Sequence, residues 1–292
     1  MGICKTGMKA SNLVTRTISG TVFLCILLAG IIFHPFGYGA ILLAVIIIGL
    51  HEFYGMLLPK PFLLRKILGY VIAIAMFALF FLKGFGLPVS GNYFWILIFP
   101  VAGVFIAELY SLSDNPFANI SGVLAGVIYV ALPFSLTTEL TMHEGNYDYR
   151  ILLALFIFLW SNDVGAYCFG MLFGGKGKHK LFERISPKKS WEGFCGGLIV
   201  SLIAAFVLLS VWGERYAFDK IHWFALAVII SLAGTFGDLT ESMLKRAAGV
   251  KDSGKIMPGH GGILDRFDSA LFAFPFALAY IYLLDINILS SC

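Results

Sequence analysis

Four acidic residues lie within or at the ends of long apolar stretches in the second half of this 292-residue chain: Asp163, Asp238, Asp265 and Asp268. A charged side chain at the centre of a bilayer costs about 3 kcal/mol on insertion scales, and such residues are usually paired, face a cavity or serve a function. One acid near a helix end could equally be an interfacial residue. Four acids near the ends of three stretches, beside the two most basic loops, instead indicate a site. Carboxylates are hard ligands for Mg²⁺ and lysines neutralise phosphate, so the grouping predicts metal and phosphate chemistry.

Helical spacing favours a single site. Asp238, Glu241 or Ser242, and Lys245 recur at intervals of three or four residues. Residues with this spacing lie on one face of a helix. We therefore expect a carboxylate, a hydroxyl or second carboxylate, and an ammonium group to lie along one helix face.

A glycine-rich loop, KRAAGVKDSGKIMPGHGG, separates that helix from the next. Gly259, Gly261 and Gly262 allow the backbone to approach a ligand closely and expose amide donors. A simple turn would explain one such glycine, but PGHGG directly before DRFD goes beyond what a turn needs. Asp265 and Asp268, three residues apart, share a face of the helix that follows.

A second basic loop reads FGGKGKHKLFERISPKKSWEG. For most of its lysines, an ordinary cytoplasmic loop near anionic lipid explains the charge at least as well as a site does. SPKKS is more specific, because Ser190, followed by Glu192, is a plausible N-cap for a helix. Lys188 and Lys189 would then lie beside a helix N-terminus, which is a favourable place for phosphate.

The elements that position these residues are membrane helices. Hydrophobic residues make up 59% of the chain and charged residues 13%, against about 25% charged in soluble proteins, which excludes a water-soluble domain. The apolar runs are continuous rather than alternating, so they predict helices and not barrel strands. We expect an all-α, polytopic integral membrane protein with about nine transmembrane helices, at 17–33, 37–57, 67–82, 93–110, 120–138, 151–173, 191–212, 221–241 and 263–284.

Basic residues predict the orientation. If every segment crosses, 17 of the 21 lysines and arginines fall on one side, and only Lys83, Arg150, Arg215 and Lys220 fall on the other. Basic loops stay cytoplasmic, so we expect a cytoplasmic N-terminus, an external C-terminus and a site that faces the cytoplasm. The compact length favours a bacterial plasma (inner) membrane.

The polar residues divide the chain in two. Residues 1–150 carry few embedded charges and are expected to form a scaffold of transmembrane helices with lipid contacts, and residues 151–292 are expected to form the catalytic part. Glu52 and Glu108 are left open between helix–helix hydrogen bonding and function. The five cysteines form no CxxC pair, so they indicate neither a disulfide framework nor a zinc site. Glycines at 165, 170 and 174 are expected to allow close helix packing.

The stretch from Ser242 to Asp268, SMLKRAAGVKDSGKIMPGHGGILDRFD, resembles the signature of the phosphatidate cytidylyltransferases (CDP-diacylglycerol synthases). That pattern runs S-x-x-K-R-x4-K-D-x5-P-G-H-G-G-x2-D-R-x-D, and the chain meets every fixed position. Asn162-Asp163, Ala166-Tyr167, the hexapeptide ISPKKS at 185–190 and Glu192-Gly193 also resemble the family. The motifs cover about residues 150–275.

The resemblance implies a reaction in phospholipid biosynthesis, in which CTP and phosphatidic acid give CDP-diacylglycerol and pyrophosphate. It also implies an all-helical fold with a polar cavity open to the cytosol, Mg²⁺ or another divalent cation with room for a second cation, and a homodimer. No nucleic-acid partner is expected. Asp238 and Asp265 match the family's metal-site aspartates, with Asp268 and Asp163 in support, and the predicted metal ligands are Asp163, Asp238 and Asp265.

The remaining roles follow from charge and from the positions that match the family's motifs. Because the attacking lipid phosphate is already anionic, no strong general base is needed, and metal and lysines stabilise the reacting phosphates. The expected catalytic residues are Asp238, Lys245, Arg246, His260, Asp265 and Asp268. The expected substrate-binding residues are Ser186, Lys188, Lys189, Ser190, Glu192, Ser242, Lys251, Asp252, Gly259, Gly261, Gly262 and Arg266. His260 is left open between a phosphate contact and a structural hydrogen bond.

Two other classes of function compete with this one. A related CTP-dependent lipid enzyme, such as a polyprenol kinase or an ether-lipid cytidylyltransferase, is the nearest, and the full PGHGG-xx-DRxD string argues against the kinase. A cation-coupled transporter also places acids among broken helices, but near the middle of the bilayer. Here the acids gather with lysines at predicted cytosolic helix ends, which favours an enzyme supplied with a soluble nucleotide.

Overall fold

The computed structural model describes residues 4–58, 63–111, 113–143, 145–174, 179–213, 219–257, 259 and 261–284. In the first helix, side chains are described from Arg16 onward. The first half contains α1 (Cys4–Phe33), α2 (Pro35–Leu57), α3 (Leu63–Gly84), the 3-10 helix η1 (Gly91–Leu97), α4 (Ile98–Leu109), α5 (Pro116–Gly126), the π-helical turn η2 (Val127–Ala131), α6 (Leu132–Leu136) and α7 (Thr138–Thr141). The second half contains α8 (Arg150–Phe173), α9 (Trp191–Trp212), α10 (Lys220–Ala247) and α11 (Leu264–Leu283).

The prediction of an all-α membrane protein is confirmed. Within the described part of the chain, eight helical segments are long and apolar enough to cross a membrane: Arg16–Phe33, Pro35–Leu57, Leu63–Gly84, Gly91–Leu109, Pro116–Thr141, Arg150–Phe173, Trp191–Trp212 and Lys220–Ala247. The ninth predicted segment forms α11, a 20-residue helix with Asp265 in its first turn. Each predicted segment is therefore helical, as expected for chains whose backbone groups must be satisfied inside a bilayer.

Two short antiparallel hairpins were not predicted. One pairs β1 (Met142–His143) with β2 (Asn146–Tyr147), and the other pairs β3 (Lys180–Phe182) with β4 (Ser186–Ser190). In the second hairpin Lys180 lies opposite Ser190 and Phe182 opposite Ser186. The SPKKS segment is thus a strand that leads directly into α9.

Helix α10 ends six residues later than predicted. It continues to Ala247, and Lys245 and Arg246 lie in its last turn. Basic residues at this end interact favourably with the helix dipole. Gly249 follows with a φ of 71°, a left-handed conformation that suits glycine and commonly ends helices.

The described residues pack as two compact units whose segments alternate along the sequence. Unit one comprises residues 1–79, 90–131 and 248–267, and unit two comprises 80–89, 132–247 and 268–292. The predicted functional division at residue 150 stays a prediction, because these units are defined by packing. Each unit is described separately below.

Unit one packs around α2. The Tyr54 hydroxyl of α2 donates to the carbonyl of Val123 on α5 at 3.0 Å. Gly69 of α3 and Gly126 of α5 leave room for the Tyr54 ring, since a side chain at either position would collide with it. Tyr38, Ile46 and Leu50 of α2 are also fully buried, so one face of α2 forms the centre of this unit.

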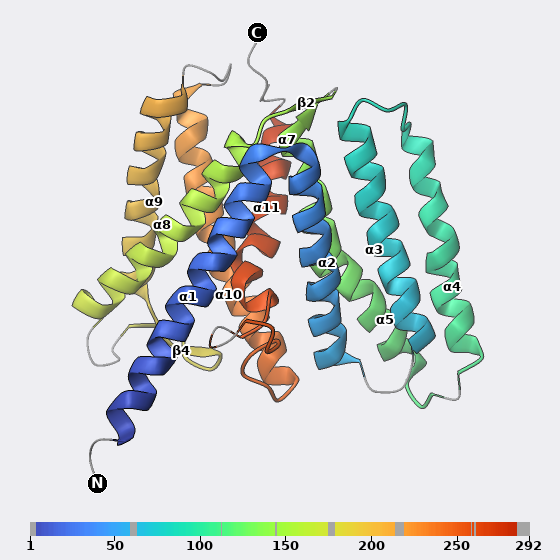
Figure 1. Cartoon of the computed structure of the whole chain (residues 1–292), viewed down its shortest axis with the longest axis horizontal. Coiled ribbons are helices and arrows are strands. Elements are labelled where there is room, and N and C mark those ends of the chain that lie inside the picture. Colours follow the sequence, from blue (N-terminus) through green and yellow to red (C-terminus); the bar gives the residue numbers. More distant parts are fainter. Residues whose placement is uncertain are drawn as a thin grey trace. The chain divides into compact units, whose positions relative to one another are not determined.

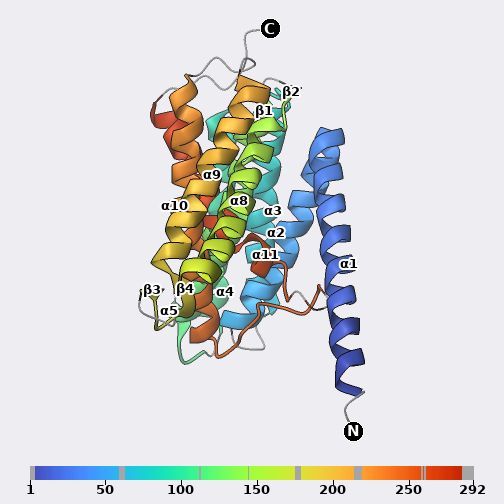
Figure 2. The ribbon, with the colours of Figure 1, turned by 90° about the vertical axis from the view of Figure 1, so that its left-hand side faces the viewer.

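Unit two contains α8, α9 and α10 packed side by side (Figures 1 and 2). The close packing of α8 on α9 predicted from glycines is confirmed at Gly165, where an added Cβ would lie 2.7 Å from the carbonyl oxygen of Gly196 and 2.9 Å from Cα of Gly197. This approach of two backbones brings the polar ends of α8 and α9 together.

Candidate active site

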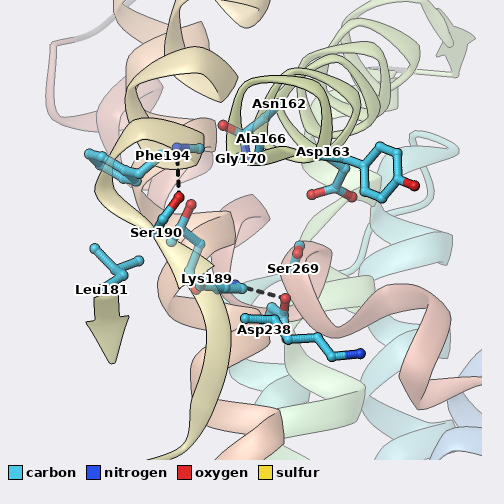
Figure 3. Close-up of a pocket in the computed structure, with 14 residues that line it drawn as sticks. Asn162, Asp163, Ala166, Gly170, Leu181, Lys189, Ser190, Phe194, Asp238 and Ser269 are labelled. Atoms are coloured by element: carbon cyan, nitrogen blue, oxygen red, sulfur yellow. Dashed lines mark hydrogen bonds and ion pairs between the residues drawn. The ribbon is translucent and has the colours of Figure 1, made fainter. Parts of the chain in front are cut away.

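A cavity of about 310 Å³ lies within unit two. Its walls come from α8, the β3–β4 hairpin, the first turn of α9, the second half of α10 and Ser269 of α11 (Figure 3). Five of the predicted site residues line it: Asp163, Lys188, Lys189, Ser190 and Asp238. Residues from four helices and one hairpin thus meet in one polar pocket.

Lys189 is held at the cavity wall. Its Nζ lies 2.7 Å from Oδ2 of Asp238 and 3.4 Å from the carbonyl oxygen of Thr235, both on α10 (Figure 3). The Lys189 and Asp238 side chains are 25% and 33% exposed, so both remain accessible from the cavity. Ser242, one turn further along α10, donates its hydroxyl to Oδ1 of Asp238 at 3.2 Å. Asp238 is therefore bonded through both oxygens.

The predicted N-cap at Ser190 is confirmed. Its Oγ accepts a hydrogen bond from the amide of Gly193 at 3.2 Å. The amide of Trp191 donates to the carbonyl of His179 at 3.0 Å. Two amides of the first turn of α9 are thus already bonded, so in this arrangement the lysines rather than these two amides can neutralise a bound phosphate.

Four carboxylates lie close together in unit two. Asp268 of α11 interacts electrostatically with Asp238 and Glu241 of α10 and with Asp163 of α8. Lys245 Nζ lies 2.7 Å from Oε2 of buried Glu241. This concentration of negative charge favours cations, and the lysines already present supply part of the positive charge that balances it.

The carboxylates suit a hard divalent cation by their chemistry. Among the residues that the structure describes, no three acidic, histidine or cysteine side chains are arranged to hold a metal ion. Mg²⁺ does not require such a cage, because it is usually bound through one or two carboxylates, waters and substrate phosphates. The donor set of unit two therefore fits a cation that binds together with a nucleotide.

In unit one, Asp265 organises the glycine-rich loop. Its Oδ2 accepts hydrogen bonds from the amides of Ser253 and Gly262 at 2.9 and 2.8 Å and from the Ser253 hydroxyl at 3.0 Å. Gly259 and Gly261 have φ values of 76° and 86°, and the Met257 amide donates to the Gly261 carbonyl at 3.0 Å. Asp265 thus binds Ser253 before this pairing of Met257 with Gly261, and Gly262 directly after it.

The other predicted residues lie outside the cavity wall. The Glu192 carboxylate lies 2.7 Å from Nδ1 of His179, and Ser186 starts β4. Asp238 belongs to unit two and Asp265 to unit one, so a metal shared by these two aspartates stays a prediction. Arg246, Lys251, Asp252 and Arg266 are exposed. His260 lies outside the described residues.

Several residues that line the cavity were not among the predicted site residues, although Asn162 and Tyr167 belong to the stretches that resemble the family. Asn162, Tyr167, Leu181, Phe194, Thr235 and Ser269 also line the cavity. Thr235 lies three residues before Asp238, so helical spacing could have indicated it. Ser269 is adjacent to Asp268, and adjacent residues do not share a helix face, so that spacing gave no sign of it. Asn162 is 4% exposed, and its Oδ1 has no hydrogen-bond partner among the described residues.

The helices and the cavity define an integral membrane protein with a polar site lined by lysines and carboxylates. Residues 14–284 match the model of the cytidylyltransferase family. The chain therefore belongs to the cytidylyltransferase family.

Similar proteins that carry a curated name are also cytidylyltransferases. The chain is 34% identical over 285 residues to the phosphatidate cytidylyltransferase of Haemophilus influenzae, covering 91% of this chain and 97% of the relative. It is 44% identical over 180 residues to the phosphatidate cytidylyltransferase of Staphylococcus saprophyticus, covering 60% of this chain and 65% of the relative. With the enzyme of Staphylococcus aureus strain COL it shares 45% identity over the same length. The match thus spans slightly less than two thirds of these staphylococcal relatives.

Proposed function

We propose that this chain is a nucleotidyltransferase that joins the cytidylyl group of CTP to phosphatidic acid and releases pyrophosphate. The cavity of unit two is the observation that carries the proposal, because it gathers Lys188, Lys189, Ser190, Asp163 and Asp238 in a chain of this family. The names of the relatives from Haemophilus and Staphylococcus supply the lipid substrate. The product, CDP-diacylglycerol, remains in the membrane in which the helices lie.

The bond changes are simple. An oxygen of the lipid phosphate attacks the α-phosphorus of CTP, the bond from that phosphorus to the bridging oxygen breaks, and pyrophosphate leaves with the electron pair. The attacking oxygen is already anionic, so no residue has to remove a proton. Catalysis then depends on holding two anionic substrates together and on stabilising charge as it moves to pyrophosphate.

Lys189 is placed for that electrostatic work. In the structure its ammonium is bonded to Asp238, and it can exchange this partner for a phosphate oxygen without a large movement. Lys188, the adjacent residue of β4, also lines the cavity. Bonds from ammonium groups to phosphate are roughly twice as strong as neutral hydrogen bonds, so these two residues are the proposed phosphate ligands.

A divalent cation would be held by carboxylates. Asp238, with Asp163 or Asp268 nearby, supplies the oxygen ligands in unit two, and Asp265 is proposed from the resemblance. When bound, Mg²⁺ neutralises phosphate charge and orients the triphosphate. Asp238 also keeps Lys189 in place, so it serves the site through two kinds of contact.

The location and the assembly are proposed as well. The basic bias of the loops supports a site on the cytoplasmic side of the cell (inner) membrane, where CTP is available. The lipid substrate then comes from the inner leaflet. A homodimer is proposed from the resemblance alone.

Purified protein in detergent tests the function. With CTP, Mg²⁺ and phosphatidic acid, we expect equal amounts of pyrophosphate and CDP-diacylglycerol, and no pyrophosphate when the lipid is left out. A phosphorylated polyprenol formed from CTP would instead identify the lipid kinase. Pyrophosphate release without any lipid would contradict the proposal.

A further inference from the structure

The carboxylate of Glu52, near the end of α2, holds the glycine-rich loop of unit one. Its Oε1 accepts a hydrogen bond from the amide of Ile263 at 3.0 Å. Its Oε2 accepts one from the amide of Leu264 at 3.0 Å and one from the hydroxyl of Ser253 at 2.9 Å. Glu52 is 5% exposed. One buried carboxylate thus binds three donors located more than 200 residues further along the chain.

Two of these donors are amides at the start of α11. The first amides of a helix have no partner within the helix, and a carboxylate there also interacts favourably with the positive end of the helix dipole. Glu52 therefore replaces a local N-cap for α11. Charge-assisted bonds of this kind fix geometry more strongly than neutral ones.

The loop is shaped to receive this carboxylate. A side chain at Gly254 would collide with Oε1 of Glu52, and one at Gly262 would collide with Oε2 of Glu52 and with the Ser253 hydroxyl. Neither Gly254 nor Gly262 is among the described glycines with positive φ, so close approach rather than backbone conformation explains the absence of a side chain at these positions. Glycine at positions 254 and 262 therefore leaves the room that the Glu52 carboxylate occupies.

We infer that Glu52 is a positioning residue for the nucleotidyl transfer, and this inference rests on the proposed function. It acts through the loop and through Asp265, which shares the Ser253 hydroxyl with it. Ser253 and Gly254 occupy variable positions of the signature pattern, so the contact adds residues that the motif does not specify. Without Glu52, the loop keeps its sequence and loses the bonds that set the orientation of Ile263 and Leu264 relative to α2.

Glu52→Gln tests this with little change in shape. A glutamine presents one oxygen and one NH₂ group, whereas Glu52 presents an acceptor to Ile263 and another to Leu264. In either orientation of the amide, the NH₂ group faces a backbone N–H, and one bond is replaced by a repulsive contact. The kcat per folded enzyme should fall about 100-fold, the loss expected for a displacement of about 1 Å near reacting groups.

Gly254→Ala disturbs the contact between Glu52 and the loop by changing the loop instead of Glu52. Its Cβ would displace the Glu52 carboxylate, so it should lower kcat in the same direction while leaving Glu52 in the chain. Gly55→Ala is the matched control, because Gly55 lies on α2 three residues after Glu52 and an added Cβ there meets nothing within 4 Å. It should retain the kcat of the unmodified protein.

The measurements are kcat at saturating CTP and phosphatidic acid, the fraction of folded protein, and amide hydrogen exchange at Ile263 and Leu264. A merely structural role would lower the folded fraction and leave kcat per folded enzyme unchanged, and that result overturns the inference. An unchanged kcat in both Glu52→Gln and Gly254→Ala overturns it as well. If Glu52→Gln does not fold, Gly254→Ala decides the question alone.

Failure of the proposed function gives a different pattern. In that case the unmodified protein forms no CDP-diacylglycerol, and hydrogen exchange still tests the contact. Faster exchange at Ile263 and Leu264 in Glu52→Gln than in Gly55→Ala would support the hydrogen bonds from these two amides to Glu52. Equal exchange in the two variants would overturn the inference.

Discussion

Removing the ammonium of Lys189 should separate its part in catalysis from its part in stability. Lys189→Met keeps most of the length of the side chain and deletes the charge that lies 2.7 Å from Asp238. Both partners are a quarter to a third exposed, and ion pairs this accessible contribute only about 0–1 kcal/mol to stability. For a chain of this size, a loss of about 1 kcal/mol lowers Tm by roughly 2–4 °C.

The expected effect on activity is larger. A hydrogen bond to a charged group contributes about 1.5–3 kcal/mol, which corresponds to a decrease in kcat/KM for CTP of roughly 10- to 150-fold. The assay is pyrophosphate release at varied CTP and saturating phosphatidic acid, combined with thermal unfolding of the same preparation. Lys180→Met is the matched control, because Lys180 lies in β3 of the same hairpin and is not among the residues that line the cavity.

Two results would refute the reasoning. Equal losses of kcat/KM in Lys189→Met and Lys180→Met would show that the hairpin only needs positive charge. An unchanged kcat/KM in Lys189→Met would show that the ion pair with Asp238 is structural and that the nucleotide binds elsewhere.

Four further predictions concern the metal, the topology, the mechanism and the N-cap of α9. Asp265→Asn should insert and fold but lose at least about 100-fold in kcat, given several kcal/mol from metal chemistry; near-normal turnover would assign Asp265 a structural role only. A reporter fused after Cys292 should register outside the cytoplasm, and a cytoplasmic signal would contradict an odd number of spans. A chiral α-thio-CTP should give inversion at phosphorus, because one in-line displacement inverts configuration; net retention would reveal a covalent nucleotidyl-enzyme. Ser190→Ala should cost about 1 kcal/mol of stability through the lost cap, and an unchanged Tm would show that Gly193 finds another acceptor.

The helices were predictable because their signal is local. Continuous apolar runs long enough to cross a bilayer leave few alternatives to a helix, and Ser190 has the residue type and position of an N-cap. Hydropathy alone ended the span of α10 at residue 241 because Lys245 and Arg246 are charged, although helical spacing had already placed Lys245 on the same helix. They are good helix formers, and their charge suits the last turn.

Contacts between distant segments were not predictable from one sequence. Nothing near Glu52 indicates that Ser253, Ile263 and Leu264 are its partners, because the pairing depends on how α2 packs in unit one. The acids of α8 and α10 could be grouped by charge and helical spacing. Their separation from Asp265 by packing unit is a property of tertiary structure that has no local pattern.

The long sequence separation between Glu52 and its donors has a consequence for biosynthesis. Helix α2 leaves the ribosome about 200 residues before Ile263 and Leu264, which corresponds to a delay of roughly 10–40 s at translation rates of about 5–20 residues per second. During that interval none of the three loop donors that bind the carboxylate in the folded protein has been synthesised. An unpaired carboxylate is costly inside a bilayer, so we expect the end of α2 to stay at the water interface at first. It can move into its final place only when the start of α11 arrives, which makes the closing of this loop one of the last events in the assembly of the chain.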